Sequence, residues 1–185
     1  MSARRANLEV KLLPHKPHKV SETGLFEGYA SLFGIADLAC DVVMPGAFAK
    51  SLATRGARGV RMLWQHDPGE PIGTWLALCE DARGLFVRGR LNLAVARARE
   101  IHALMREGGV DGLSIGYRVV KAGSGGAVRG QRLLHEVDLW EISIVTFPML
   151  PAARVGTVKS LPGSLAETIR RAAARLFPPV AHPCA

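Results

Sequence analysis

The stretch that decides the fold is His135-Glu-Val-Asp-Leu-Trp-Glu-Ile-Ser-Ile-Val-Thr-Phe147, which is followed by Pro148 and Pro151. Its apolar residues alternate with polar ones, a period of two that is typical of a strand. By this period, residues 135, 137, 139, 141 and 143 are expected to share one face. The pattern therefore predicts one long β-strand near the end of the chain.

Further short segments upstream also have the composition of strands, and turn residues separate them. The predicted strands are 8–12, 24–33, 60–64, 73–80, 84–91 and 113–120. Pro68 and Gly69 indicate a turn, which places His66 at the end of a strand beside a loop. Residues 54–59 are expected to form a loop.

Only one helix is well marked within this series of strands. Residues 94–107 repeat apolar side chains every three or four positions, and Gly108 and Gly109 end the pattern. Pro45 is expected to open a short helix that runs to Leu52. Since regular strand–helix alternation is missing, the order favours an α+β, mainly antiparallel barrel or sandwich with helices outside it.

The last part of the sequence differs from the body and is expected to be a separate unit. We predict a domain over residues 1–155, followed by a linker and a basic helical tail over 156–185. Ser164 and Glu167 form a capping box that predicts a helix over 165–176. The tail helix has an apolar stripe, which can be buried against a partner or against the body.

The composition limits the classes of protein to be considered. Apolar residues make up 48% of the 185 and aromatic residues 6%, which predicts a mostly aliphatic core. No apolar run approaches the roughly 20 residues that a membrane helix needs, so no membrane partner is expected, and the N-terminus lacks the pattern of a secretory signal. The three cysteines form no CxxC pair, which argues against a disulfide framework and for the reducing cytosol.

The positive charge lies at the two ends of the chain. Residues 1–20 hold five Lys/Arg against one Glu, and so do residues 154–185, while the part between them is balanced. A nucleic-acid reader normally has a continuous basic face, so nucleic acid is not expected as a specific partner. The two ends are either solvated tails or contacts for an acidic partner.

Ser114 lies in Gly112-Leu-Ser-Ile-Gly116, which matches the GxSxG nucleophile elbow of α/β-hydrolases. That elbow requires a strand, a sharp turn and then a helix. Here a helix comes first, and the serine begins a predicted strand. We therefore reject the α/β-hydrolase interpretation but keep Ser114 as a candidate nucleophile.

Several blocks of the sequence resemble the prohead proteases of tailed phages. The blocks are Gly28-Tyr-Ala-Ser-Leu-Phe-Gly34, Val43-Met-Pro-Gly-Ala-Phe48, Trp64-Gln-His-Asp67, Asp111-Gly-Leu-Ser-Ile-Gly-Tyr117 and Leu139-Trp-Glu-Ile-Ser-Ile-Val-Thr-Phe-Pro148. They stand in the family's order over residues 8–155. The resemblance implies a β-barrel with peripheral helices, like that of herpesvirus assemblins. It also implies a serine endopeptidase that cleaves capsid and scaffold proteins during head maturation, from a phage, a prophage or a gene-transfer particle.

The resemblance also implies the roles of the site residues. Ser114 would be the nucleophile and His66 its general base, since a serine hydroxyl needs a base with a pKa near the working pH. Assemblins use a second histidine as the third member, which favours His135. The family's strongest block and the cost of an unpaired glutamate in an apolar strand favour Glu141, which we predict. His135 and Glu141 lie about 20 Å apart along a strand, so only one of them can reach His66.

The remaining expectations concern partners, cofactors and place of action. No metal or cofactor is implied, and the oxyanion donors stay open. The enzyme is expected in the cytoplasm of the bacterial host, inside the assembling procapsid, with the major capsid protein and scaffold segments as substrates. A second copy of the chain is a further candidate partner. The alternative is a catalytically inactive scaffold or assembly protein of the capsid.

Overall fold

The computed structural model describes residues 20–125 and 130–156, which contain seven strands and two helices. In chain order they are β1 (Leu25–Leu32), β2 (Asp41–Val43), α1 (Ala49–Gly59), β3 (Arg61–Trp64), β4 (Asp67–Glu80), β5 (Gly84–Leu91), α2 (Ala96–Glu107), β6 (Gly112–Ser124) and β7 (Arg132–Val145). The expected strand over 8–12 and the tail helix over 165–176 lie outside the described residues. The mainly β fold with peripheral helices is confirmed.

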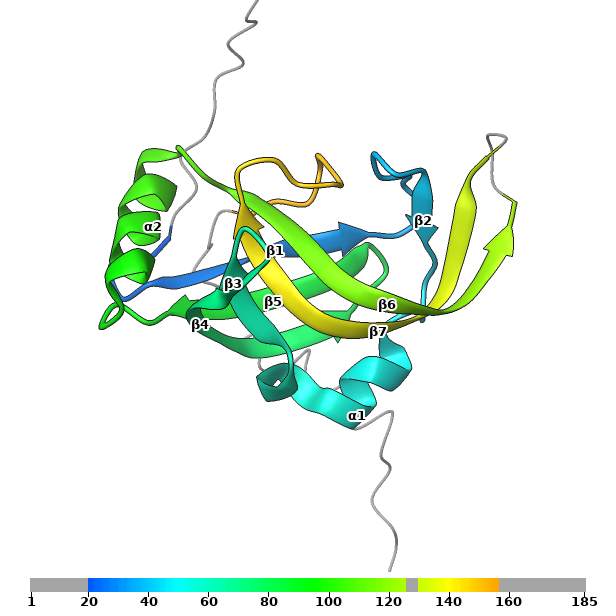
Figure 1. Cartoon of the computed structure of the whole chain (residues 1–185), viewed down its shortest axis with the longest axis horizontal. Helices are drawn as coiled ribbons and strands as arrows, with labels where there is room; N and C mark the ends of the chain where they lie inside the picture. The colour runs from blue at the N-terminus through cyan, green and yellow to red at the C-terminus, as the bar shows by residue number, and fades with distance from the viewer. Residues whose placement is uncertain (1–19, 126–129, 157–185) are drawn as a thin grey trace, which may run out of the picture.

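All seven strands belong to one sheet that is strongly curled (Figure 1). The strands follow one another in the order β1-β5-β4-β3-β7, and neighbours from β1 to β3 are antiparallel. One edge of β7 pairs in parallel with β2 near its start and with β3 near its end. Its other edge pairs antiparallel with β6. The long strand that the sequence predicted therefore lies at the centre of the sheet.

The two outer strands of the sheet, β1 and β6, are bridged by residues 153–156, which we call the closing segment. The Leu113 N–H donates to the Ala153 carbonyl at 2.9 Å, and the Gly156 N–H donates to the Glu27 carbonyl at 2.8 Å. The segment passes so close to Gly28 that a Cβ there would lie 2.3 Å from a backbone oxygen. The closing segment thus completes the barrel, and only glycine fits at that position of β1.

The core fills the inside of this barrel and is mostly aliphatic, as expected. The aromatic side chains Trp75 and Phe26 meet edge to face, with ring centroids 5.6 Å apart. The two helices lie outside the sheet: α1 packs on β4 and β7, and α2 on β4 and β5 (Figure 1). Helix α2 buries Ala98, Ile101 and Met105 against the core. It ends at Gly108, whose φ of 78° is the left-handed cap that the sequence indicated.

Two of the expected boundaries are wrong. The predicted loop over 54–59 is helical in part, because α1 continues across a break at Gly56, where φ is 62°. The turn predicted at Pro68 and Gly69 lies inside β4. Leu63 pairs with Pro71 and Trp64 with Asp67, so residues 68–70 are extra residues on β4. The chain reverses earlier, at residues 65 and 66.

Candidate active site

His66 lies in the turn of the hairpin that joins β3 to β4, just beyond the strand end at which the sequence placed it. Trp64 pairs with Asp67, so Gln65 and His66 form a two-residue turn. Both have positive φ, 52° and 61°, as type I′ turns require, although such positions usually hold Gly, Asn or Asp. The Gln65 side-chain amide donates to the Thr146 hydroxyl at 2.7 Å and ties the turn to the end of β7.

Glu141 reaches this turn because β7 contains a bulge at Trp140. Gly116 of β6 pairs with Glu141, and the next residue, Tyr117, pairs with Leu139, so Trp140 is the extra residue. Leu139 and Ile142 are both fully buried in the core, although strict alternation would place them on opposite faces. The expectation that residues 135, 137, 139, 141 and 143 share one face is therefore wrong, because the alternation shifts at Trp140. The bulge turns Glu141 away from the core and toward His66.

His66 and Glu141 are in direct contact. The His66 Nδ1 and the Glu141 Oε1 are 2.6 Å apart, and the side chains are 42% and 13% exposed. The hydrogen bond to Glu141 raises the pKa of His66 above its ordinary value of 6.5, burial opposes this, and the carboxylate charge adds to it. With Nδ1 engaged by the carboxylate, Nε2 is the imidazole nitrogen left to accept a proton.

Gly116 makes room for the Glu141 carboxylate. A Cβ at residue 116 would lie 2.1 Å from the Glu141 Oε1, a distance at which one of the two groups must move. The second glycine of the GxSxG pattern therefore has a role unrelated to a nucleophile elbow. It lets a carboxylate from β7 cross over the backbone of β6.

Ser114 lies on the same strand, close to this pair. It is 4% exposed and pairs directly with Ser143 of β7. Ser114 and Gly116 are two residues apart in a regular part of β6, so their side-chain directions share the face toward Glu141. Within residues 20–125 and 130–156 the Ser114 hydroxyl makes no hydrogen bond. Catalytic hydrogen bonds often tighten only when substrate is bound.

His135, the alternative third member, lies elsewhere. It is exposed near the start of β7, where its Nε2 lies 3.3 Å from the position of a Cβ built on Gly123. Glu141, and not His135, is the group that the fold brings to His66. Ser114 itself begins a strand after α2, so the rejected nucleophile-elbow geometry is absent from the described chain at this serine.

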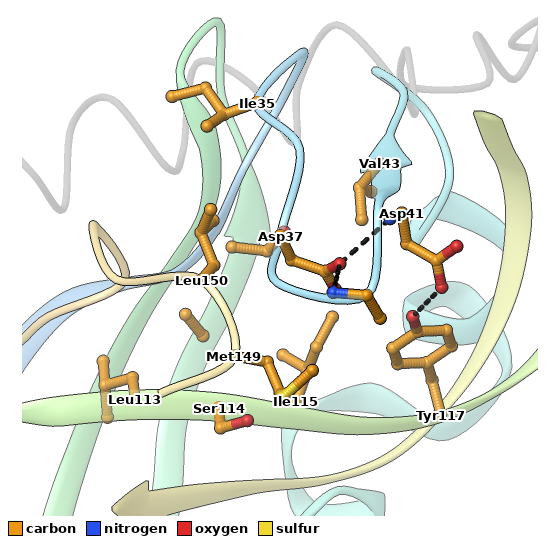
Figure 2. Close-up of a pocket in the computed structure, with 13 residues that line it drawn as sticks. Ile35, Asp37, Asp41, Val43, Leu113, Ser114, Ile115, Tyr117, Met149 and Leu150 are labelled. Atoms are coloured by element: carbon orange, nitrogen blue, oxygen red, sulfur yellow. Dashed lines mark hydrogen bonds between the residues drawn. The ribbon is translucent and has the colours of Figure 1, made fainter. Parts of the chain in front are cut away.

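A pocket whose lining includes Ser114 lies over β6, and Figure 2 shows it between the loop before β2 and the loop after β7. Its volume is about 130 Å³. Leu113 and Tyr117 extend from β6 toward it, whereas the Ser114 side chain leaves the strand on the other side (Figure 2). Its walls are largely apolar, and two of the apolar side chains that line it, Ile35 and Met149, are also exposed to solvent.

One end of this pocket is polar and internally paired. Arg132 donates two hydrogen bonds to the Asp41 carboxylate at 2.7 and 2.5 Å, and the Tyr117 hydroxyl donates a third at 3.1 Å. The Arg132 hydrogen bonds lower the pKa of Asp41 despite its burial, and burial, followed by the Asp41 charge, raises the pKa of Tyr117. These groups are satisfied by one another, which leaves the apolar wall as the surface for a ligand.

The sequence analysis missed Ser143. Its hydroxyl donates to the Glu141 Oε2 at 2.6 Å, and its oxygen accepts the His66 backbone N–H at 3.1 Å. The signal available was its spacing, two residues from Glu141 in a strand, which puts both side chains on one face. No group of three or more potential metal ligands occurs in the described ranges, and no helix there is long and apolar enough to cross a membrane.

Comparisons with known proteins agree with the sequence blocks. The model of the caudovirus prohead serine protease family matches residues 13–165. The prohead protease of Enterobacteria phage HK97 is 40% identical over 148 residues, which are 80% of this chain and 64% of that protein. The chain therefore spans less than two thirds of that relative's length.

Two solved structures are also similar. A KSHV protease bound to a hexapeptide phosphonate inhibitor aligns with a TM-score of 0.49 and 11% identity, over 82% of this chain and 76% of that one. The bacteriophage T4 capsid assembly protease aligns with a TM-score of 0.49 and 14% identity, over 67% of this chain and 82% of that one.

Proposed function

Because the chain belongs to the caudovirus prohead serine protease family, we propose that it is a serine endopeptidase that cleaves capsid and scaffold proteins during head maturation. The observation that carries the proposal is the contact between His66 and Glu141 beside Ser114. It supplies a base, an orienting carboxylate and a nucleophile on three neighbouring strands or turns. A scaffold protein without chemistry has no need of a strained histidine turn fixed to a half-buried carboxylate.

In the proposed mechanism the Ser114 oxygen attacks the scissile carbonyl carbon of the substrate. His66 Nε2 takes the proton from the Ser114 hydroxyl and later gives it to the leaving amine. Glu141 accepts the Nδ1 hydrogen bond, keeps the imidazole in the required tautomer and stabilises its charged form. The acyl enzyme is then hydrolysed by water through the same base.

We further propose that the substrate binds as an extended strand along β6. The closing segment covers the outer edge of β6 at residues 111–113. From Ser114 onward, no described residue pairs with that edge. The backbone N–H of Leu113 points away from β7, so by alternation the N–H of Ile115 does too. It can donate a hydrogen bond to a substrate peptide that adds to this edge as a new strand. The apolar pocket on that side would receive a substrate side chain next to the scissile bond.

The enzyme is proposed to act inside the assembling procapsid, in the cytoplasm of the bacterial host. The tail from residue 157 lies outside the described part of the chain and beyond the closing segment. We propose that the tail is dispensable for chemistry and concentrates the protease in the assembling head through contacts with scaffold or shell proteins.

Co-expression with the major capsid protein of the same particle tests the proposed activity. Ser114→Ala and His66→Ala are each expected to abolish cleavage, by a factor on the order of 10⁴ or more, since members of such a triad act as a unit. Mass spectrometry of the capsid protein reads the outcome, and circular dichroism checks the fold of each variant. A fully active Ser114→Ala enzyme would exclude the mechanism, and an inactive wild type would favour the scaffold alternative.

A further inference from the structure

We propose that Ser143 is a positioning residue for this site, because its single hydroxyl fixes both the Glu141 carboxylate and the turn that carries His66. The inference rests on the proposed function and deepens it. It concerns a residue that acts through two others and is not itself expected to touch the substrate.

The hydroxyl of Ser143 is fully engaged by the two proposed catalytic residues. Its hydrogen goes to the Glu141 Oε2 at 2.6 Å, and its oxygen accepts the backbone N–H of His66 at 3.1 Å. Ser143 is 0% exposed, so water does not compete for these bonds. A serine whose only role was to satisfy a strand would have no reason to contact both residues.

The first bond restricts the carboxylate. The terminal torsion of a glutamate side chain is soft, so a carboxylate that is held at one oxygen can turn about it. His66 holds Oε1 and Ser143 holds Oε2, which fixes the plane of the carboxylate. The lone pair of Oε1 then stays directed at the imidazole, as orientation of the base requires.

The second bond holds the strained turn. The positive φ of His66 is unfavourable for a residue other than glycine, so the conformation persists only where other contacts favour it. The Ser143 oxygen supplies such a contact at the backbone of His66 itself. Ser143 also stands directly opposite Ser114 in the β6–β7 pairing. The positions of His66, Glu141 and Ser114 are therefore all fixed relative to Ser143.

Titration of the His66 imidazole by NMR in the full-length protein tests the proposal. In Glu141→Gln the His66 pKa is expected to fall, because the carboxylate that raises it is gone. In Ser143→Ala the pKa should fall in the same direction by a smaller amount, since the carboxylate is present but no longer held. The alanine removes one oxygen atom from a buried position, and a dispersed NMR spectrum confirms that the fold persists.

Ser51 provides a matched control. It is also a buried serine whose oxygen accepts a backbone N–H of β7, that of Leu139 at 2.9 Å, but it has no hydrogen bond to Glu141 or His66 in the described structure. Ser51→Ala should lower the melting temperature and leave the His66 pKa unchanged. A Ser143→Ala protein that behaves in this way, with an unchanged His66 pKa, would overturn the proposal.

A double-mutant cycle adds a second measurement. Ser143→Ala alone should lower kcat on the order of 10- to 100-fold with KM little changed. Added to Glu141→Gln, it should change kcat by less than about twofold, because the group through which it acts is already lost. If Ser143→Ala lowers kcat by the same factor in the wild type and in Glu141→Gln, the proposal is overturned. If the wild type cleaves no substrate, the proposed function fails, while the NMR comparison still decides the role of Ser143.

Discussion

At the scale of single residues, the site depends on how the Glu141 carboxylate changes the imidazole beside it. The hydrogen bond raises the pKa of His66, so the charged form is favoured at pH values where an ordinary histidine is neutral. The pair therefore stabilises the fold fully at pH values below the ordinary pKa, and this stabilisation is lost as the pH rises through the raised pKa. Catalysis needs the opposite form, because a general base must be neutral.

The pH dependence of kcat/KM should show this conflict. We expect the wild-type rate to rise with pH on an acid limb whose midpoint lies above 6.5, at the raised pKa of His66. Glu141→Gln should move that midpoint to lower pH and reduce the plateau rate, because the imidazole is then less basic and less well oriented. Rates against a capsid-derived peptide over pH 5–9 give both quantities.

His102→Gln is the control for this measurement, since the His102 Nε2–H donates one hydrogen bond to the Ser21 backbone oxygen and the residue has no hydrogen bond to Glu141 in the described structure. Its pH profile should match that of the wild type. A Glu141→Gln enzyme whose acid limb stays at the wild-type position would show that Glu141 does not control the base.

At the scale of secondary-structure elements, periodicity located the strands but not the irregular points within them. The alternation in β7 predicted its length and its central place, since a period of two is a local property of the chain. The bulge at Trp140 depends on how β6 pairs with β7, and no pattern within 135–147 contains that information. Glu141 was still predicted correctly as the partner of His66, because an unpaired carboxylate among apolar residues is costly on either face.

The pocket lies between the loop before β2 and the loop after β7, and both loops contribute residues to its lining. Met149→Asp, at a side chain that is 44% exposed in its wall, should raise KM for a capsid-derived peptide about 10-fold or more with kcat nearly unchanged. The reason is that a charge in the apolar wall opposes burial of a substrate side chain. Steady-state kinetics separate the two constants.

Leu76→Asp is the matched control, since Leu76 is 46% exposed on β4 and does not line this pocket. It should leave both constants unchanged. A Met149→Asp enzyme with a wild-type KM would show that the pocket does not bind the substrate.

At the scale of the whole molecule, the closing segment joins the two outer strands of the sheet at the end of the described chain. The sequence analysis predicted a boundary at residue 155, where the resemblance to the family ends and a linker follows, and the backbone bonds of the closing segment continue to Gly156. The Arg154 guanidinium also pairs with the Asp111 carboxylate, just before β6. Contacts of this kind join distant parts of the chain and leave no periodic signal, so sequence patterns alone could not reveal that the barrel closes here.

Two truncations test the boundary. A chain that ends at Gly156 should hydrolyse peptide like the full chain. A chain that ends at Ala152 should lose on the order of 3 kcal/mol of stability and melt about 10 °C lower, because Val155 leaves the core and the edges of β1 and β6 are uncovered.

Hydrolysis of peptide and packaging into heads are scored separately. Normal hydrolysis with failed packaging for the chain that ends at Gly156 supports a delivery role for the tail, whereas loss of both places the tail within the fold.

The late position of the closing segment also has a consequence for the order of events during synthesis. The ribosome releases the His66 turn 75 residues before Glu141, and the barrel lacks its last bridge until residue 156 has emerged. Pairings over such long separations form slowly, after local structure is in place. A nascent chain therefore cannot form the contact between His66 and Glu141 before residue 141 has emerged. The topology therefore orders assembly: the contact between His66 and Glu141 forms late, and the closing segment can bridge β1 and β6 only at the end.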